Sequence, residues 1–273
     1  WVTANETHLA QTNMTWRMKW ATAGETKHAP QLLEIQVAAC DHVELRSSAS
    51  PLLQDVTSAV LGRVSGFRQQ VLRGIDDWSR RLSKIDDMDI YGHHGIAIGD
   101  TNGDGRDDVY VCDGGGLPNR LYEQQPDGTL IDVSDRSNTD WLESSSAALL
   151  LDLDNDGDQD LVVATVAGLI IAANRGNGDF EIRTARPGTS ETQSLCAADY
   201  DNDGDLDLYL SVYGPNSSSQ AARGFEAAAP IPYHDANNGG RNILLKNQGD
   251  FEFVDVTDAV GLNDNNQRFS FAA

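Results

Sequence analysis

The sequence predicts an all-β fold of the β-propeller type, built from four-stranded blades. Three acidic segments of one pattern recur along the chain, and each lies between two apolar runs of strand length. Their first aspartates are at positions 100, 152 and 199, so the spacings are 52 and 47 residues. That period suits one blade per repeat. A hairpin pattern with a glycine-containing turn follows each acidic segment. The chain is therefore expected to hold three to four blades.

The first element of each repeat reads as strand, acidic loop and strand. These segments are IAIGDTNGDGRDDVYV (96–111), LLLDLDNDGDQDLVV (149–163) and CAADYDNDGDLDLYL (196–210). The hairpins that follow them are NRLYEQQPDGTLIDVSD (119–135), LIIAANRGNGDFEIRTA (169–185) and NILLKNQGDFEFVDVTD (242–258). The end of the last hairpin, DVTDAV, is repeated as DVTSAV at 55–60. An earlier repeat is therefore expected to begin near residue 50.

The repeats divide the chain into an N-terminal segment, 1–49, and a propeller region, 50–273. Residues 1–49 hold two strand candidates, 15–22 and 31–45, without a repeat signature. Two insertions are expected in the propeller, a helix at about 64–86 and a loop at about 211–240 that is rich in Ser, Ala, Gly, Pro and Asn. The helix is predicted to pack on the propeller through one apolar face. That face contains Phe67, Val71, Ile75, Trp78, Leu82 and Ile85. Residues 268–273 read as the strand of a further repeat, so the propeller is expected to be incomplete at its C-terminal end.

Each acidic loop has the spacing of a calcium site. Calcium takes six to eight oxygen ligands, and these loops place side-chain oxygens at positions 1, 3, 5 and 9 and a backbone carbonyl at position 7. Glycine at position 6 allows the sharp turn. The predicted ligands are Asp100, Asn102, Asp104, Arg106 and Asp108 in the first loop, Asp152, Asp154, Asp156, Asp158 and Asp160 in the second, and Asp199, Asp201, Asp203, Asp205 and Asp207 in the third. About three Ca²⁺ ions are expected.

Two other interpretations of the loops fit the sequence less well than calcium-binding blades. An EF-hand requires a bidentate glutamate at position 12, whereas these loops have Val111, Val163 and Leu210 there, within apolar strands. A solvated turn rich in Asp, Asn and Gly explains one isolated match better than three matches in phase. The carboxylates would repel one another without a cation, so calcium is expected to contribute to the stability of the fold.

The charge of the chain limits its partners and location. The formal net charge is −22, which argues against nucleic acid and anionic membrane surfaces because both require a basic patch. The longest apolar run, 161–173, is too short to span a bilayer. Loosely held calcium sites of this kind fill where calcium is plentiful, so an extracellular, periplasmic or cell-envelope location is expected.

The repeated segments resemble the FG-GAP/VCBS repeat family, whose calcium-loop blades are also seen in integrin α-subunits. The likeness covers about residues 50–273. The combination GDTNGDGRDDVYV, GLPNRLY, DGTLIDVS, DLDNDGDQDLVVA, ADYDNDGDLDLYL and NILLKN is most similar to bacterial exported VCBS-repeat proteins of the ASPIC/UnbV type. The C-terminal domain of those proteins has no counterpart in this sequence. The resemblance implies a fragment of a propeller of roughly seven blades, and a role in binding and adhesion without a defined reaction.

Two functional hypotheses follow. The first is a non-catalytic, calcium-stabilised propeller that binds a protein or a polysaccharide. The second is a propeller-scaffold enzyme, a lyase or hydrolase, that acts on acidic polysaccharides. Its candidate acid/base residues are Tyr233, His234 and Asp235 in the loop insertion, although a packed tyrosine and a solvated His-Asp pair explain them equally well. The first hypothesis is favoured. The sequence does not predict the oligomeric state.

Overall fold

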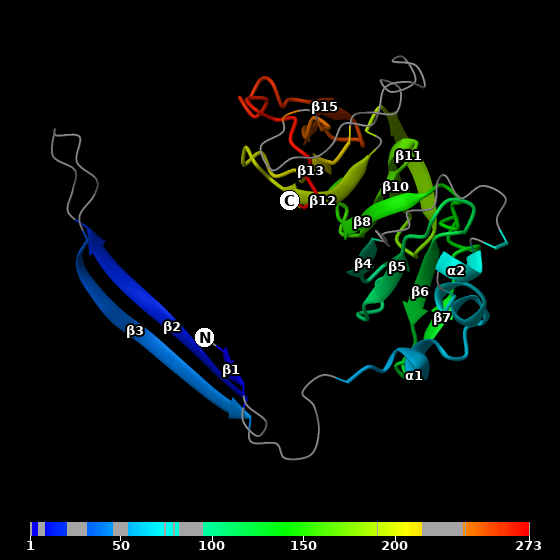
Figure 1. Cartoon of the computed structure of the whole chain (residues 1–273), viewed down its shortest axis with the longest axis horizontal. Coiled ribbons are helices and arrows are strands. Elements are labelled where there is room, and N and C mark those ends of the chain that lie inside the picture. The colour runs from blue at the N-terminus through cyan, green and yellow to red at the C-terminus, as the bar shows by residue number, and fades with distance from the viewer. Residues whose placement is uncertain are drawn as a thin grey trace. The chain divides into compact units, whose positions relative to one another are not determined.

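The structure of the chain is a computed structural model that describes residues 2–4, 9–20, 32–45, 54–73, 75–78, 80–81, 95–189, 191–214, 237 and 239–272. It consists of two compact units, Trp1–Val56 and Thr57–Ala273, which are drawn in Figure 1. The boundary lies a few residues beyond the expected one. No helix among the described residues has the length and apolar character needed to cross a membrane.

The N-terminal unit contains one antiparallel sheet with strands β1 (Val2–Ala4), β2 (Leu9–Trp20) and β3 (Leu32–Leu45). Side chains alternate between the two faces of a strand, and this alternation places Trp16 and Met18 of β2 opposite Val37 and Ile35 of β3. These four side chains are 48–50% exposed. The sheet therefore has an exposed apolar face.

The second unit contains three four-stranded antiparallel sheets, and in each sheet the strands are neighbours in chain order. Blade 1 consists of β4 (Ile96–Gly99), β5 (Asp108–Val111), β6 (Arg120–Gln124) and β7 (Leu130–Asp132). Blade 2 consists of β8 (Ser145–Leu151), β9 (Asp160–Thr165), β10 (Gly168–Asn174) and β11 (Phe180–Pro187). Blade 3 consists of β12 (Thr192–Ala198), β13 (Asp207–Val212), β14 (Ile243–Asn247) and β15 (Phe253–Asp255). The predicted all-β architecture of four-stranded blades is confirmed.

The blades pack face to face, and β8 lies between β4 and β12 (Figure 1). The core between blades 1 and 2 includes Tyr110, Leu121 and Leu161. The core between blades 2 and 3 includes Val162 and Leu208. Every residue of β9 is buried because both faces of blade 2 are covered. This explains why its segment reads as a continuous apolar run rather than an alternating one.

A helical segment covers the other face of blade 1. It contains α1 (Thr57–Leu61), a π-helical turn η1 (Phe67–Val71) and α2 (Ile75–Trp78). Phe67 packs there with Tyr122 and Leu130, so the predicted packing against the propeller is confirmed for the start of the insertion.

The predicted single helix at about 64–86 is wrong for its described part, which holds the two short elements η1 and α2. The helical turns are short, and Val71 is 40% exposed. The turn at Gly62 and Arg63 separates α1 from the helical residues that follow. Leu82 and Ile85 of the expected face lie outside the described residues.

The connections between strands vary in length at one end of the blades and have a constant length at the other. The link between the first and second strands has eight residues in every blade: 100–107, 152–159 and 199–206. The link between the second and third strands, at the opposite end, is 112–119 in blade 1, 166–167 in blade 2 and 213–242 in blade 3. Length therefore varies at one end of the blades and is constant at the other.

Candidate metal centres

The three constant links are the acidic loops, and they share one hydrogen-bond pattern. The position-1 carboxylate accepts the backbone N–H groups of positions 5 and 6, and the position-5 carboxylate accepts the N–H of position 7. The bonds from position 5 to position 1 are 3.1 Å at Asp100, 3.2 Å at Asp152 and 3.0 Å at Asp199. Those from position 7 to position 5 are 2.9 Å at Asp104, 2.9 Å at Asp156 and 3.1 Å at Asp203. The three loops thus share their hydrogen-bond geometry as well as their sequence pattern.

Glycine at position 6 makes this turn possible. Gly105, Gly157 and Gly204 have φ values of +80°, +96° and +97°, a region that side-chain-bearing residues rarely adopt. Their N–H groups donate to the position-1 carboxylates at 2.7, 3.0 and 3.0 Å. The turn wraps the loop around the oxygens of positions 1, 3 and 5.

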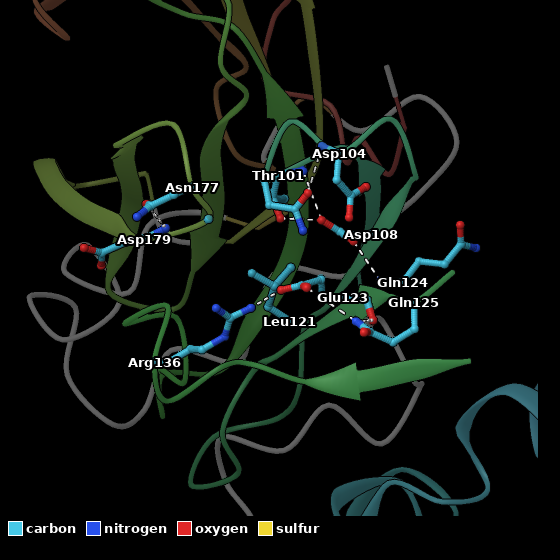
Figure 2. A network of polar contacts seen from close by, with 12 residues as sticks. Thr101, Asp104, Asp108, Leu121, Glu123, Gln124, Gln125, Arg136, Asn177 and Asp179 are labelled. Carbon is cyan, nitrogen blue, oxygen red and sulfur yellow. Dashed lines mark hydrogen bonds and ion pairs between the residues drawn. The ribbon is translucent and has the colours of Figure 1, made fainter. Parts of the chain in front are cut away.

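The position-9 aspartates anchor the loops to the blades. Asp108, Asp160 and Asp207 are at most 1% exposed. One oxygen of each accepts the N–H of position 2, at 3.0, 2.9 and 3.1 Å. The other accepts an N–H at the end of the third strand, at 2.8, 2.9 and 2.9 Å. Figure 2 shows Thr101 and Asp108 at this corner of blade 1. Oδ2 of Asp108 also accepts the Thr101 hydroxyl at 2.5 Å, whereas the oxygens of Asp160 and Asp207 each keep a lone pair available for an ion.

Burial makes four of these carboxylates harder to ionise than an exposed aspartate. Burial raises the pKa of Asp160 to about 6 and also raises the pKa values of Asp108 and Asp207. Burial and the charge of Asp156 raise the pKa of Asp154. A cation at the loop would favour the ionised forms.

Two of the loops gather enough acidic oxygens to hold an ion. Asp152, Asp154 and Asp156 bring one oxygen each within 4.8 Å of one another, and Asp199, Asp201 and Asp207 do the same. In the first loop Asn102 supplies an amide oxygen at position 3. An oxygen-only donor set with several carboxylates is the kind that suits a hard cation such as Ca²⁺.

The third loop already contacts a positive group. The ammonium of Lys246, on β14, makes ion pairs with Asp201 and with Asp203, the latter at 2.8 Å. These residues are at positions 3 and 5 of the predicted ligand set. A positive charge therefore stands where the calcium hypothesis requires one, and the residues present fit the ion.

Sequence reasoning missed two buried asparagines that join neighbouring loops. Asn174 Nδ2 donates to the carbonyl of Thr101, position 2 of the first loop, at 2.7 Å and to that of Gln159, position 8 of the second, at 3.0 Å. Asn247 Nδ2 repeats this with the carbonyls of Leu153 at 2.8 Å and Leu206 at 3.3 Å. We call Asn174 and Asn247 the inter-blade asparagines. A sequence signal existed, since each ends its third strand and is followed two residues later by glycine.

The suggested acid/base residues cannot be placed relative to the loops. Tyr233, His234 and Asp235 lie outside the described residues, as does most of the predicted loop insertion.

Comparisons with known proteins support the repeat. Residues 100–163 and 152–210 match the family of FG-GAP-like repeats. Each match runs from position 1 of one loop to the second strand of the next blade. The chain thus contains FG-GAP-like repeats in phase with its blades.

Two individual proteins are similar to parts of the chain. Cartilage acidic protein 1 of Xenopus tropicalis is 28% identical over 157 residues, which are 54% of this chain and 24% of that protein. The match therefore spans about a quarter of the relative's length. A solved structure, described as the specific recognition of non-reducing terminal N-acetylglucosamine by an Agrocybe aegerita lectin, has a TM-score of 0.38 and 17% identity. It covers 66% of this chain and 40% of that chain.

Proposed function

We propose that the chain is a calcium-stabilised, non-catalytic binding module of the β-propeller type that works outside the cytoplasm. The observation that carries this proposal is the threefold recurrence of one loop geometry, with a left-handed glycine at position 6 and a buried aspartate at position 9. Solvated turns would not need a buried carboxylate at the same place in three blades.

Calcium would act as a structural ion. In each loop the carboxylates of positions 1, 3, 5 and 9, with Asn102 as the one amide, and the carbonyl of position 7 would hold it. The ion would neutralise carboxylates that otherwise repel one another. At a free calcium concentration about 100 times the dissociation constant, each site adds about 2.7 kcal/mol to the free energy of unfolding. Three such sites rival the total stability of an ordinary domain, which is about 5–15 kcal/mol.

The opposite end of the blades supports a binding role. There the link between the second and third strands grows from two residues in blade 2 to thirty in blade 3. Variable connections on a rigid scaffold commonly carry recognition. We infer that a protein or polysaccharide ligand binds at this end, with residues 213–242 as the main contact. The net charge of −22 disfavours nucleic acid as the ligand.

The location follows from the calcium requirement. Loosely held structural sites fill near millimolar calcium, which is found outside the cytoplasm. The proposed setting is extracellular, periplasmic or in the cell envelope. The resemblance to exported ASPIC/UnbV-type proteins is compatible with this setting. The alternative, an enzyme for acidic polysaccharides, remains a prediction that rests on Tyr233, His234 and Asp235.

Calorimetric titration of the chelator-treated protein tests the calcium part of the proposal. We expect about three equivalents of bound calcium and a raised melting temperature. Asp152→Ala should remove one equivalent, and Asn177→Ala, an exposed change outside the loops, should remove none. No stabilisation by calcium in the unsubstituted protein would refute the structural role of the ion.

A second experiment tests the binding part. Immobilised glycans and candidate proteins are probed with the chain and with a variant in which residues 215–236 are replaced by a short Gly-Ser linker. We expect the variant to keep its calcium-induced rise in melting temperature and to lose ligand binding. If the variant binds as well as the unaltered chain, the proposed binding end is wrong.

A further inference from the structure

The three loops differ in the charge placed beside them by the third strand of their own blade. In each blade the last residue of the third strand donates its N–H to the position-9 aspartate. The residue before it is Glu123 in blade 1, Ala173 in blade 2 and Lys246 in blade 3. The same register thus holds a negative, a neutral and a positive side chain. Sites with closely similar backbone geometry therefore have different electrostatic surroundings.

Lys246 contacts the third loop directly. Its ammonium makes ion pairs with Asp201 and Asp203 and lies 6.0 Å from the centroid of the Tyr200 ring. The side chain is 24% exposed. A lysine ammonium paired with two carboxylates is charged at neutral pH.

The second loop has no such partner. Among the described residues, no Lys or Arg nitrogen lies within 4.0 Å of the carboxylates of Asp152, Asp154 or Asp156. The first loop is intermediate: the Arg106 guanidinium contacts Asp104, but its Nε is also held by the Gln124 carbonyl at 3.1 Å. Glu123 adds a negative charge nearby, which contributes to raising the pKa of Asp108, and it pairs with Arg136 (Figure 2).

We propose that Lys246 is a built-in competitor of calcium in the third loop, and that it makes this loop the weaker counterpart of the second. The inference rests on the proposed calcium binding. The ammonium and the ion need the same oxygens of positions 3 and 5. Calcium must displace the ammonium or bind beside it against like-charge repulsion. The second loop fills without that cost.

The position of Lys246 gives this competition a consequence. Lys246 is the residue before the last of β14 and lies at the calcium end of this strand, whereas residues 213–242 join the strand at its other end. The second loop would then remain filled at low calcium, while the third would respond to the concentration outside the cell.

The position-6 glycines provide a separate reporter for each loop. Their N–H groups donate to the position-1 carboxylates, so ion binding at a loop changes the amide chemical shift of its own glycine. Isotope-labelled, chelator-treated full chain is titrated with CaCl₂ while the signals of Gly157 and Gly204 are followed. We expect the midpoint of Gly204 to be about tenfold higher than that of Gly157, as one unit charge close to a divalent ion allows.

Two variants isolate the charge. Lys246→Met should lower the midpoint of Gly204 about tenfold and change that of Gly157 much less, and a retained response of Gly157 also shows that the variant is folded. Lys246→Arg, which keeps the charge, should retain the high midpoint. As KCl is raised, the midpoint of Gly204 in the wild-type chain should approach that of the Met variant, because salt screens the repulsion between the ammonium and the ion.

The outcomes separate this inference from the one on which it rests. If none of the glycine amides responds to calcium, the calcium proposal itself fails. If the glycines respond but the midpoint of Gly204 is not above that of Gly157, or is unchanged by Lys246→Met, calcium binding stands and the competition by Lys246 is refuted.

Discussion

Replacement of the inter-blade asparagine Asn247 by alanine tests how strongly the loops hold neighbouring blades together. Asn247 is 1% exposed. Its Nδ2 donates to the carbonyls of Leu153 and Leu206, and its Oδ1 accepts the N–H of Gly249 at 3.0 Å. Alanine leaves these backbone groups without their partner, and the Leu153 carbonyl is in a buried site.

The magnitude follows from these bonds. A buried polar group that loses its partner costs about 1–3 kcal/mol. The 2.8 Å bond to Leu153 crosses between blades, whereas the groups of Leu206 and Gly249 lie near the surface of the loop and the turn. The loss of the bond to Leu153 is counted at the full cost and the losses of the bonds to Leu206 and Gly249 at part of it. We therefore expect Asn247→Ala to lower the free energy of unfolding by about 3 kcal/mol.

Equilibrium urea denaturation, with and without calcium, measures the effect. Asn247→Asp keeps the shape but turns the donor toward two carbonyls into an acceptor, so we expect it to destabilise at least as much. Asn177→Ala is the control: this exposed asparagine accepts only the nearby N–H of Asp179 at 3.2 Å among its described bonds, and its loss should cost at most about 0.5 kcal/mol. A loss below 1 kcal/mol for Asn247→Ala would refute the role of the asparagine as a link between blades.

Other predictions concern pH, the helical cover and the turn. The folded-state pKa of Asp160 is about 6, against an ordinary value of 3.8, so its contribution to the stability of the calcium-free protein is present below 3.8 and is lost as pH rises through 6. Calcium needs the ionised form, and the calcium-induced rise in melting temperature should therefore shrink as pH falls from 7 to 5; a rise that is constant across this range would contradict the assignment. Phe67→Ala should cost about 3–5 kcal/mol in urea denaturation, whereas Val71→Ala, at an exposed position, should cost under about 1 kcal/mol; equal effects would show that the segment does not cover blade 1. Gly157→Ala forces a side chain into a φ of +96° with open space around it, so it should destabilise by about 1–2 kcal/mol through the backbone alone, and an unchanged midpoint would disprove the strain.

The blades were predictable because their signal is local and repeated. The loop from Asp152 to Asp160 contains its own spacing, its own turn glycine and the first residue of the following strand. Three copies in phase fix the period, and the period fixes the four-stranded unit. Nothing about the distant parts of the chain is needed for that step.

The links between blades were not predictable in the same way. Asn174 reads as a turn residue from its neighbours, yet its amide nitrogen binds Thr101, far away in the sequence. The choice of a buried bond over a solvated one depends on the angle at which two blades meet, and no local pattern encodes that angle. Likewise, the apolar spacing around Phe67 predicts one helix, whereas the structure divides the segment into short helical elements, with Phe67 packed on blade 1.

The asparagine links imply that the loops do not fill independently. Asn174 binds a carbonyl next to predicted ligands of the first loop and, with the same nitrogen, a carbonyl between predicted ligands of the second. Ordering either loop around an ion reduces the conformational entropy that the other must still lose. Calcium binding should therefore show positive cooperativity along the row of blades, and by reciprocity each ion should raise the affinity of the neighbouring loop for calcium by the same factor.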